Sequence, residues 1–431
     1  MRFNSYSFKE LLSNIVDNRG KTCPVGETGI PLIATNCIKE YSLYPVFEKV
    51  RYVSDETYSS WFRGHPEPGD MIFVCKGSPG RVNWVPDPVN FCIAQDMVAI
   101  RADTTKVYPK YLFALLRSQA SQQKILNMHV GTLIPHFKKG DFGNLYFDIP
   151  EDMEYQKKVG DAYFDFCLMI ESNTQTNQTL EEMAQAIFKS WFVDFDPVKA
   201  KMNGEQPEGM DEATASLFPD KLDSETGIPD GWTQGSIADI AKLNAKSWTK
   251  KNSPEQVHYV DLANTKNGVI ESVTTYDFEE SPSRARRILN SGDTIVGTVR
   301  PGNRSYAFIG DTEKPLTGST GFAVLSPKKS YWTSFVYLAT TNDDSIDEYA
   351  RLADGGAYPA IKPTVVADTQ CAIPTEDIAK KFWELTGPML RKAHQNRLQN
   401  EDLAALRDTL LPKLLSGEIE LGQTEEMAEV S

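Results

Sequence analysis

The feature that most constrains this fold is an internal repeat with an offset of 223 or 224 residues. The segment PGDMIFVCKGSPGR (68–81) matches NSGDTIVGTVRPGNR (290–304), and the matched Gly-Asp pairs stand at 69–70 and 292–293. The segment GTLIPHFKKGDFGNLYFDIP (131–150) matches GGAYPAIKPTVVADTQCAIP (355–374) without a gap. A chain of 431 residues is long enough for two to three domains. The repeat therefore predicts two copies of one folding unit.

Each copy ends in a heptad pattern. Apolar residues that recur every seven positions predict a helix packed along another helix. Asn173 and Asn396 occupy matching steps of the two patterns, so we expect the two helices to face each other, with the polar step fixing their register. The seam of the first helix is Val159, Phe166, Asn173, Leu180 and Ile187, and that of the second is Phe382, Met389, Asn396, Leu403 and Leu410.

The predicted fold class is α+β, with two mixed α/β domains separated by two long helices. Short apolar runs such as DMIFVCKG and FCIAQDMVAIRA have strand length, and turn-forming residues separate them. The expected order is a first globular domain (1–150), a first long helix (151–203), an acidic linker (204–230), a second globular domain (231–375), a second long helix (376–420) and a disordered tail (421–431).

The distribution of charge leaves nucleic acid open as a ligand. The net charge is −14, yet residues 1–150 hold 17 Lys and Arg against 14 Asp and Glu. Residues 151–230 hold 6 against 18, so the acidity is concentrated in the first long helix and the linker. Binding to phosphates depends on local basic patches rather than on the total charge.

Signatures of catalysis are missing from the sequence. It contains no G-x-x-x-x-G-K-[ST] loop, G-x-S-x-G elbow or H-E-x-x-H pair, and its five histidines are widely spread. The six cysteines show no C-x-x-C spacing, which indicates free thiols in a reducing cytoplasm rather than a zinc site or a disulfide framework. No apolar run predicts a signal peptide or a membrane span. We expect no catalysis and no metal site in this chain.

Candidate ligand-binding residues lie on matched loops. Gly-rich loops with Arg, Asn and Ser suit close approach to phosphates and base edges, although a solvated hairpin explains the same composition. A second set lies on the loop that precedes the last strand of each copy. The first set is Lys76, Ser78 and Arg81 with Arg300, Asn303 and Arg304, and the second is His136, Lys138 and Lys139 with Tyr358 and Lys362.

Three segments resemble the specificity subunit of type I restriction–modification systems. They are NQTLEEMAQAIFKSWFVDFDPVKAKMNG after the first unit, GIPDGW at the start of the second, and NEDLAALRDTLLPKLLSGEIEL near the end. The order of domain, helix, domain and helix covers essentially the whole chain. The opening MRFNSYSFKELL departs from the pattern because it lacks the Trp found at Trp232. This leaves the start of the first domain undefined.

The resemblance implies a non-catalytic subunit that recognises DNA. Each domain would be a target-recognition domain that reads one half of a bipartite duplex target. The two helices would pair as an antiparallel coiled coil that sets the spacer. Two methyltransferase subunits would dock, in part on Phe188, Trp191, Phe192 and Phe195. Restriction subunits, which are translocase-nucleases, would join them. S-adenosylmethionine, ATP and Mg would be held by the partners, and no cofactor by this chain.

Two other functions compete with DNA recognition. One is a tandem binding module for protein or RNA, and the other is a methyltransferase whose motifs have drifted. A steep dependence of duplex binding on salt would separate the first from DNA recognition. Methylation by the purified chain alone would establish the second.

Overall fold

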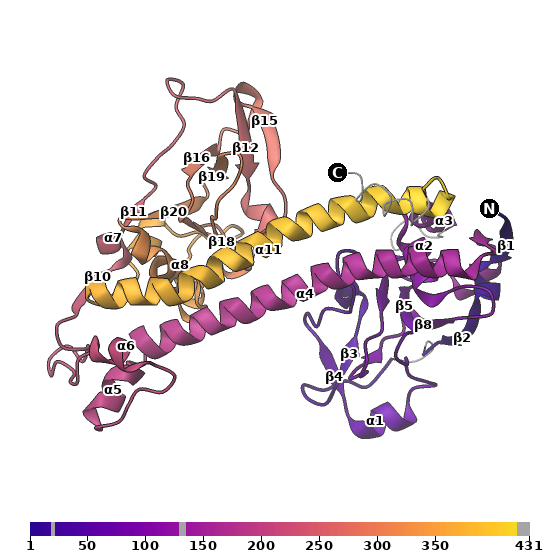
Figure 1. Ribbon diagram of the computed structural model, residues 1–431, viewed down its shortest axis with the longest axis horizontal. Coiled ribbons are helices and arrows are strands. Elements are labelled where there is room, and N and C mark those ends of the chain that lie inside the picture. The colour runs from indigo at the N-terminus through magenta and orange to yellow at the C-terminus, as the bar shows by residue number, and fades with distance from the viewer. Residues whose placement is uncertain (19–21, 129–134, 420–431) are drawn as a thin grey trace, which may run out of the picture. The chain divides into compact units, whose positions relative to one another are not determined.

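The computed structural model describes residues 1–18, 22–128 and 135–419. The chain divides into two compact units. Unit 1 comprises Met1–Thr174 and Arg397–Ser431, and unit 2 comprises Gln175–Asn396. Each unit contains a globular part with strands and short helices and a portion of each long helix (Figure 1). The predicted α+β class is confirmed.

The globular part of unit 1 is built on three small sheets, with strand orders β2-β8-β5-β6, β4-β3-β7 and β1-β9. Within the second sheet, β3 runs parallel to β7 and antiparallel to β4. The strands are β1 (Phe3–Ser7), β2 (Leu12–Val16), β3 (Ile30–Ile33), β4 (Arg51–Val53), β5 (Met71–Val74), β6 (Val82–Trp84), β7 (Cys92–Ile93), β8 (Met97–Ala102) and β9 (Tyr146–Pro150). The helices are η1 (Phe8–Leu11), η2 (Thr35–Cys37), α1 (Asp55–Ser60), α2 (Pro109–Arg117), α3 (Gln119–Met128) and η3 (Lys139–Gly143).

The sequence of strand β5 is apolar without alternation because both faces of the strand are buried. Successive side chains of a strand point to opposite faces of the sheet. Met71 and Phe73 enter the core formed with α2, whereas Ile72 and Val74 enter a second core on the other face. All four side chains are fully buried. The run MIFV is thus a strand covered on both faces, and it positions the loop that follows it.

Unit 2 repeats this architecture. Its sheet orders β11-β20-β17-β18 and β10-β21 match those of unit 1, and β15-β12-β19 matches β4-β3-β7, with β16 added as a fourth strand. Strand β12 runs parallel to β19 as β3 does to β7. The two-stranded pair β13-β14 has no counterpart among the described strands of unit 1. The strands are β10 (Thr233–Ser236), β11 (Ala241–Leu243), β12 (Gln256–Val260), β13 (Thr265–Lys266), β14 (Val269–Ile270), β15 (Thr274–Asp277), β16 (Ala285–Leu289), β17 (Thr294–Gly297), β18 (Tyr306–Phe308), β19 (Leu316–Ser319), β20 (Phe322–Pro327) and β21 (Gln370–Ile373). The helices are α7 (Ile237–Ile240), η4 (Leu262–Asn264), η5 (Phe278–Glu280), η6 (Pro301–Asn303), η7 (Ser330–Trp332), α8 (Thr333–Thr341), α9 (Asp343–Leu352) and α10 (Pro363–Ala367).

The Gly-Asp pairs of the repeat form the same turn in both units. Gly69 and Gly292 have φ angles of 84° and 88°, a left-handed conformation that glycine adopts without strain. The carboxylates of Asp70 and Asp293 are buried, and each accepts a hydrogen bond of 2.8 Å from the backbone N–H three residues earlier. The repeat seen in the sequence is therefore a repeat of local backbone geometry.

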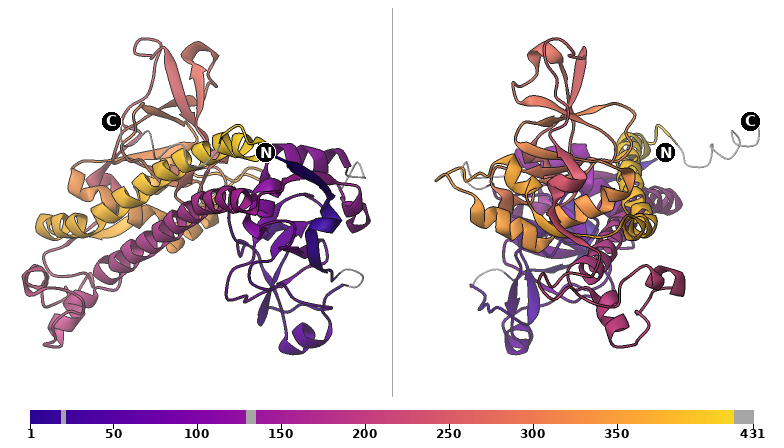
Figure 2. Two further views of the ribbon diagram at one scale, coloured as in Figure 1. Left: turned by 45° about the vertical axis from the view of Figure 1, so that its right-hand side comes forward. Right: turned by 90° about the vertical axis from the view of Figure 1, so that its left-hand side faces the viewer.

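The two long helices are α4 (Met153–Phe192) and α11 (Glu376–Ser416), of 40 and 41 residues (Figures 1 and 2). Helix α4 ends earlier than the predicted boundary at 203. Phe195 has a φ angle of 57°, which breaks the helix, and a short helix α5 (Asp196–Met202) follows with Pro197 in its first turn. The predicted disordered tail, 421–431, lies outside the described residues.

The asparagines of the heptad seam pair in an equivalent way in each unit. In unit 1 the Asn173 amide donates to Asn400 Oδ1 at 2.9 Å, and in unit 2 the Asn396 amide donates to Asn177 Oδ1 at 2.9 Å. The repeat offset of 223 residues converts one pair into the other. In unit 1 the contacts run from Tyr155–Leu414 to Asn173–Asn400, so the helices pair antiparallel. In unit 2 they run from Asn177–Asn396 to Phe192–Phe382 in the same antiparallel sense. The predicted facing of the two helices is confirmed within each unit, where Asn173 pairs with Asn400 and Asn396 pairs with Asn177.

The predicted acidic linker, 204–230, is partly built into unit 2. It contains helix α6 (Glu212–Ser216), and Phe218 within it is 2% exposed. The ring of Phe218 lies 5.0 Å from that of Trp191 and 6.4 Å from that of Trp232. An acidic linker was expected for this segment. The burial of Phe218 was missed because a single aromatic residue does not change the polar composition of the segment.

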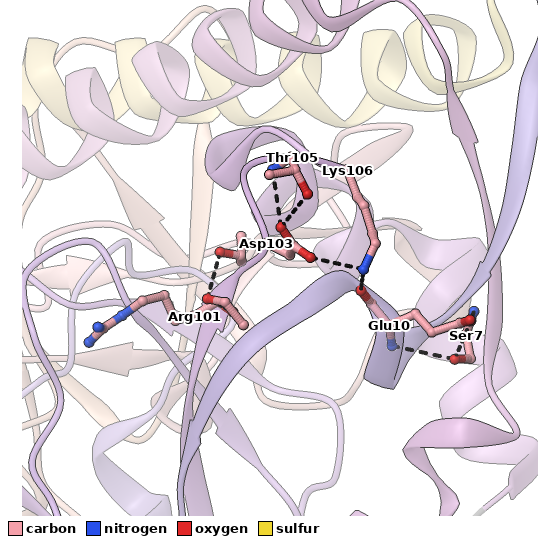
Figure 3. A network of polar contacts seen from close by, with 8 residues as sticks. Ser7, Glu10, Arg101, Asp103, Thr105 and Lys106 are labelled. Carbon is pink, nitrogen blue, oxygen red and sulfur yellow. Dashed lines mark hydrogen bonds and ion pairs between the residues drawn. The ribbon is translucent and has the colours of Figure 1, made fainter.

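A polar network ties the start of the chain to the segment between β8 and α2 (Figure 3). Ser7 and Glu10 form a capping box around η1. The Lys106 ammonium donates to the Glu10 carbonyl at 3.0 Å and pairs with Asp103 at 2.9 Å. The carboxylate of Asp103 also accepts hydrogen bonds from the hydroxyl and backbone N–H of Thr105.

This network predicts a change of stability in acid. Hydrogen bonds from Thr105 and Lys106 lower the pKa of Asp103 to about 2. A lowered folded-state pKa adds stability that is fully present above the ordinary value near 4 and is lost as the pH falls towards about 2. We expect the melting temperature of Asp103→Asn to fall less between pH 5 and about 2.5 than that of the parent chain. Identical acid dependence of the two melting temperatures would contradict this.

Candidate nucleic-acid interface

In unit 1, the two candidate loops lie side by side because their backbones are hydrogen bonded. The Phe137 N–H donates to the Cys75 carbonyl at 2.9 Å, and the Gly77 N–H donates to the Pro135 carbonyl at 2.9 Å. These bonds form an antiparallel bridge between Lys76 and His136. Residues 75–81 and 135–139 therefore form one surface, which we call the first loop pair.

Unit 2 contains the same arrangement. The Ile361 N–H donates to the Thr298 carbonyl at 2.9 Å, and the Arg300 N–H donates to the Pro359 carbonyl at 2.7 Å. The bridge here joins Val299 to Ala360. Each of these bonds is the repeat equivalent of one in unit 1. Residues 298–304 with 354–362 form the second loop pair.

The predicted residues of the first loop pair differ in exposure. Lys76 and Lys138 are exposed, and Ser78 and His136 are half-buried beside them. Two other cations are engaged within unit 1. Arg81 pairs with Glu40 at 3.2 Å, and Lys139 pairs with Asp17 at 3.3 Å. Lys76 and Lys138 are therefore the cations of this loop pair best placed to meet an anion.

The second loop pair is more exposed and carries an aromatic ring. Arg300, Asn303 and Lys362 are exposed, and Tyr358 is 71% exposed. The Arg304 guanidinium pairs with Asp343 at 2.7 Å, which fastens the loop to the first turn of α9. Burial opposes the charged form of Arg304, but the pairing with Asp343 outweighs it, so the pKa of Arg304 is raised. Arg81 and Arg304 are thus anchored at the ends of their loops, whereas Arg300 extends from the middle.

A basic edge of unit 2 was missed by reasoning from the sequence. The Trp248 N–H donates to the Arg286 carbonyl at 2.8 Å, and the Ile288 N–H donates to the Lys246 carbonyl at 3.2 Å. Residues 246–248 thereby extend the sheet beyond β16. The signal was the cluster SRARR at 283–287, which has no equivalent in the first copy. The edge gathers Lys246, Lys250, Lys251, Arg284, Arg286 and Arg287.

The aromatic end of α4 is not the exposed docking surface that was expected. Phe188, Trp191 and Phe192 are 4%, 7% and 5% exposed within the core of unit 2, and Phe195 packs against that core. The prediction that these rings are exposed is wrong. The physical reason is that the globular part of unit 2 and helix α11 supply their apolar partners, with the Phe192 ring 4.9 Å from Phe335 and 4.8 Å from Phe382.

Among the residues that the structure describes, no group of three or more His, Cys, Asp or Glu side chains is arranged to hold a metal ion. Within the same ranges, no helix is long and apolar enough to cross a membrane. The six cysteines are free thiols, four of them buried.

Comparison with known proteins agrees with the sequence patterns. Residues 29–182 match the model of the type I restriction modification DNA specificity domain. The specificity subunit of the type I restriction enzyme HindI from Haemophilus influenzae is 25% identical over 403 residues, covering 81% of this chain and 86% of the relative. Residues 29–182 thus contain a type I restriction modification DNA specificity domain, and the chain is similar over most of its length to a type I specificity subunit. The resemblance inferred from the sequence is confirmed.

Two further similarities extend over most of the chain. The specificity subunit of the type I restriction enzyme MjaIX from Methanocaldococcus jannaschii is 24% identical over 325 residues, covering 73% of this chain and 69% of the relative. The crystal structure of the type I restriction–modification S subunit from M. genitalium has a TM-score of 0.55 at 15% identity and covers 96% of both chains. The second similarity supports the fold.

Proposed function

We propose that this specificity subunit recognises a bipartite duplex DNA target, with one loop pair reading each half. The observation that carries the proposal is the equivalence of the two loop pairs. The same backbone bonds present exposed Lys76 and Lys138 in unit 1 and exposed Arg300 and Lys362 in unit 2. Phosphate contacts from such cations position a protein on DNA, and side chains on protruding loops read base edges.

The long helices suit a spacer between the two recognition modules. A helix of 40 residues is roughly 60 Å long at about 1.5 Å per residue. The matched Asn173–Asn400 and Asn396–Asn177 pairs fix the register of α4 on α11 in each unit. A fixed spacer selects targets whose half-sites are correctly separated, and linking two readers raises the effective concentration of the second.

The chemistry would belong to partner subunits. We propose two methyltransferase subunits that carry S-adenosylmethionine, and translocase-nuclease subunits that use ATP and Mg. The long helices expose apolar side chains that suit partner docking better than the buried aromatic end of α4. These exposed residues are Leu168, Met169 and Met183 on α4 and Leu385, Leu398 and Leu406 on α11.

The test of the proposed function is a map of methylated bases in genomic DNA from cells with and without this chain. We expect one bipartite motif, with two half-sites and a fixed spacer, to lose methylation when the chain is absent. A methylation pattern that does not depend on the chain would overturn the proposal. Methylation by the purified chain alone would favour the drifted methyltransferase.

Phosphate contacts predict how salt affects binding. Lys138→Ala and Lys362→Ala should each weaken the binding of duplex DNA by this chain assembled with its methyltransferase subunits, whatever the DNA sequence. Each should also reduce the slope of log affinity against log salt by about 0.9, the value for one released counterion. Lys199→Ala, an exposed lysine on α5, is the matched control and should leave the slope unchanged. Unchanged slopes for both loop variants would remove these lysines from the interface.

A further inference from the structure

Arg300 has an unusual backbone conformation for a residue with a side chain. Its φ and ψ angles are 48° and 61°, in the left-handed region that residues other than glycine and asparagine rarely adopt. The repeat equivalent in unit 1 is Gly77, with a φ of 91°, which meets the same requirement without strain. Strained residues of this kind persist where the surrounding structure over-determines them, and they concentrate at functional sites.

The guanidinium of Arg300 is held in place by the opposite loop. Its central carbon lies 4.6 Å from the centroid of the Tyr358 ring, and its Nη2 donates to the Ala357 carbonyl at 2.7 Å. Tyr358 is itself held in a turn, since its N–H donates to the Gly355 carbonyl at 3.0 Å. Contacts of this kind fix the plane of the guanidinium before any ligand arrives.

Most donors of this guanidinium remain available to a ligand. An arginine side chain has five N–H donors, and the bond to Ala357 uses one of them. Arg300 is exposed, and within the described ranges no carboxylate forms an ion pair with it. In the major groove guanine presents two acceptors, O6 and N7, in the geometry that a planar guanidinium matches with two parallel hydrogen bonds.

We propose that Arg300 reads one guanine in the half-site recognised by unit 2, and that Tyr358 is a positioning residue that orients its guanidinium. This inference rests on the proposed function and names the base for one loop. It also predicts an asymmetry between the half-sites. The first copy has Gly77 in place of Arg300, and Ile134 by sequence in place of Tyr358, so it cannot read a guanine in this way.

The experiment maps the methylated motif in cells that lack the chain and are complemented with the parent chain or a variant. Arg300→Ala and Arg300→Lys should each relax one guanine position in one half-site, because alanine has no donors and lysine lacks the planar fork of the guanidinium. Discrimination against the other bases at that position should fall about 10- to 100-fold, the usual value of a bidentate contact. The other half-site and the spacer should be unchanged.

The Tyr358 variants distinguish positioning from a general structural role. Tyr358→Phe keeps the stacked ring and should keep the motif, whereas Tyr358→Leu should relax the same guanine position as Arg300→Ala. Lys362→Ala, a neighbouring cation of the same loop pair, should keep every base preference. If Arg300→Ala abolishes methylation altogether, the motif methylated with the Tyr358→Leu variant decides whether Arg300 reads the guanine.

Failure of the inference differs from failure of the proposed function. A motif that retains the guanine in Arg300→Ala, or in Tyr358→Leu when the alanine variant is inactive, would overturn the assignment of Arg300. In that case the parent chain would still direct a bipartite motif. Absence of any motif that depends on the parent chain would overturn the proposed function itself.

Discussion

Replacing Phe382 with alanine is expected to lower the free energy of unfolding of unit 2 by about 3–5 kcal/mol. The side chain of Phe382 is completely buried where α11 meets the end of α4. Its ring lies 4.8 Å from that of Phe192, 5.7 Å from that of Trp191 and 6.2 Å from that of Phe188. Truncation removes the apolar burial and leaves a cavity that several rigid rings cannot fill. Denaturant unfolding monitored by tryptophan fluorescence measures the loss.

Leu385→Ala is the matched control on the same helix. Leu385 lies three residues further along α11 and is 43% exposed. Its truncation should change the free energy of unfolding by no more than about 0.5 kcal/mol, as is usual for surface positions. Equal losses for the two variants would show that the aromatic cluster does not stabilise unit 2 as described.

A matched pair of four-residue insertions is expected to abolish methylation at the native target and create a target with a longer spacer. One insertion is placed between Thr174 and Gln175 and the other between Asn396 and Arg397, where the chain passes between the two units. Four helical residues add about 6 Å, close to the rise of two base pairs. Both asparagine pairs and both loop pairs stay intact, so the half-sites should be unchanged. Methylation mapping reads both the half-sites and the spacer.

The control for this design is the insertion in α4 alone. It lengthens one helix of the pair without the other and should disrupt the register, which would lower the melting temperature and remove methylation at every spacer. The proposal that the long helices set the spacer would be rejected if the matched insertions left the native spacer in use. It would also be rejected if they changed the half-sites themselves.

The repeat and its long helices could be predicted from the sequence because they depend on periodic patterns. A heptad seam specifies a helix packed on a helix, whatever the rest of the fold does. The turn at each Gly-Asp pair needs a left-handed residue, which glycine supplies at Gly69 and at Gly292. The matched Gly-Asp pairs therefore predicted equivalent strands after them. The candidate loops were found for the same reason, since they follow matched strands. Burial of the strand MIFV on both faces was consistent with its unbroken apolar run.

Other features depended on contacts between residues far apart in the sequence. The sequence at the end of α4 contains aromatic residues, but it does not reveal that Phe335 and Phe382 cover their rings. Likewise, the sequence placed Arg81, Arg300 and Arg304 in equivalent loops without separating them. The ion pairs of Arg81 with Glu40 and of Arg304 with Asp343 distinguish anchored cations from the exposed Arg300.

The sequence alone therefore determined the repeat, the long helices, the family resemblance and the loops that carry candidate residues. These follow from local conformational preferences and from spacing, which are properties of neighbouring positions. The tertiary structure decided which cations remain exposed, which aromatic rings are already covered, and how Arg300 is fixed against Tyr358. Those outcomes depend on which distant groups meet in space, and the burial and pairing of a side chain are set by those neighbours.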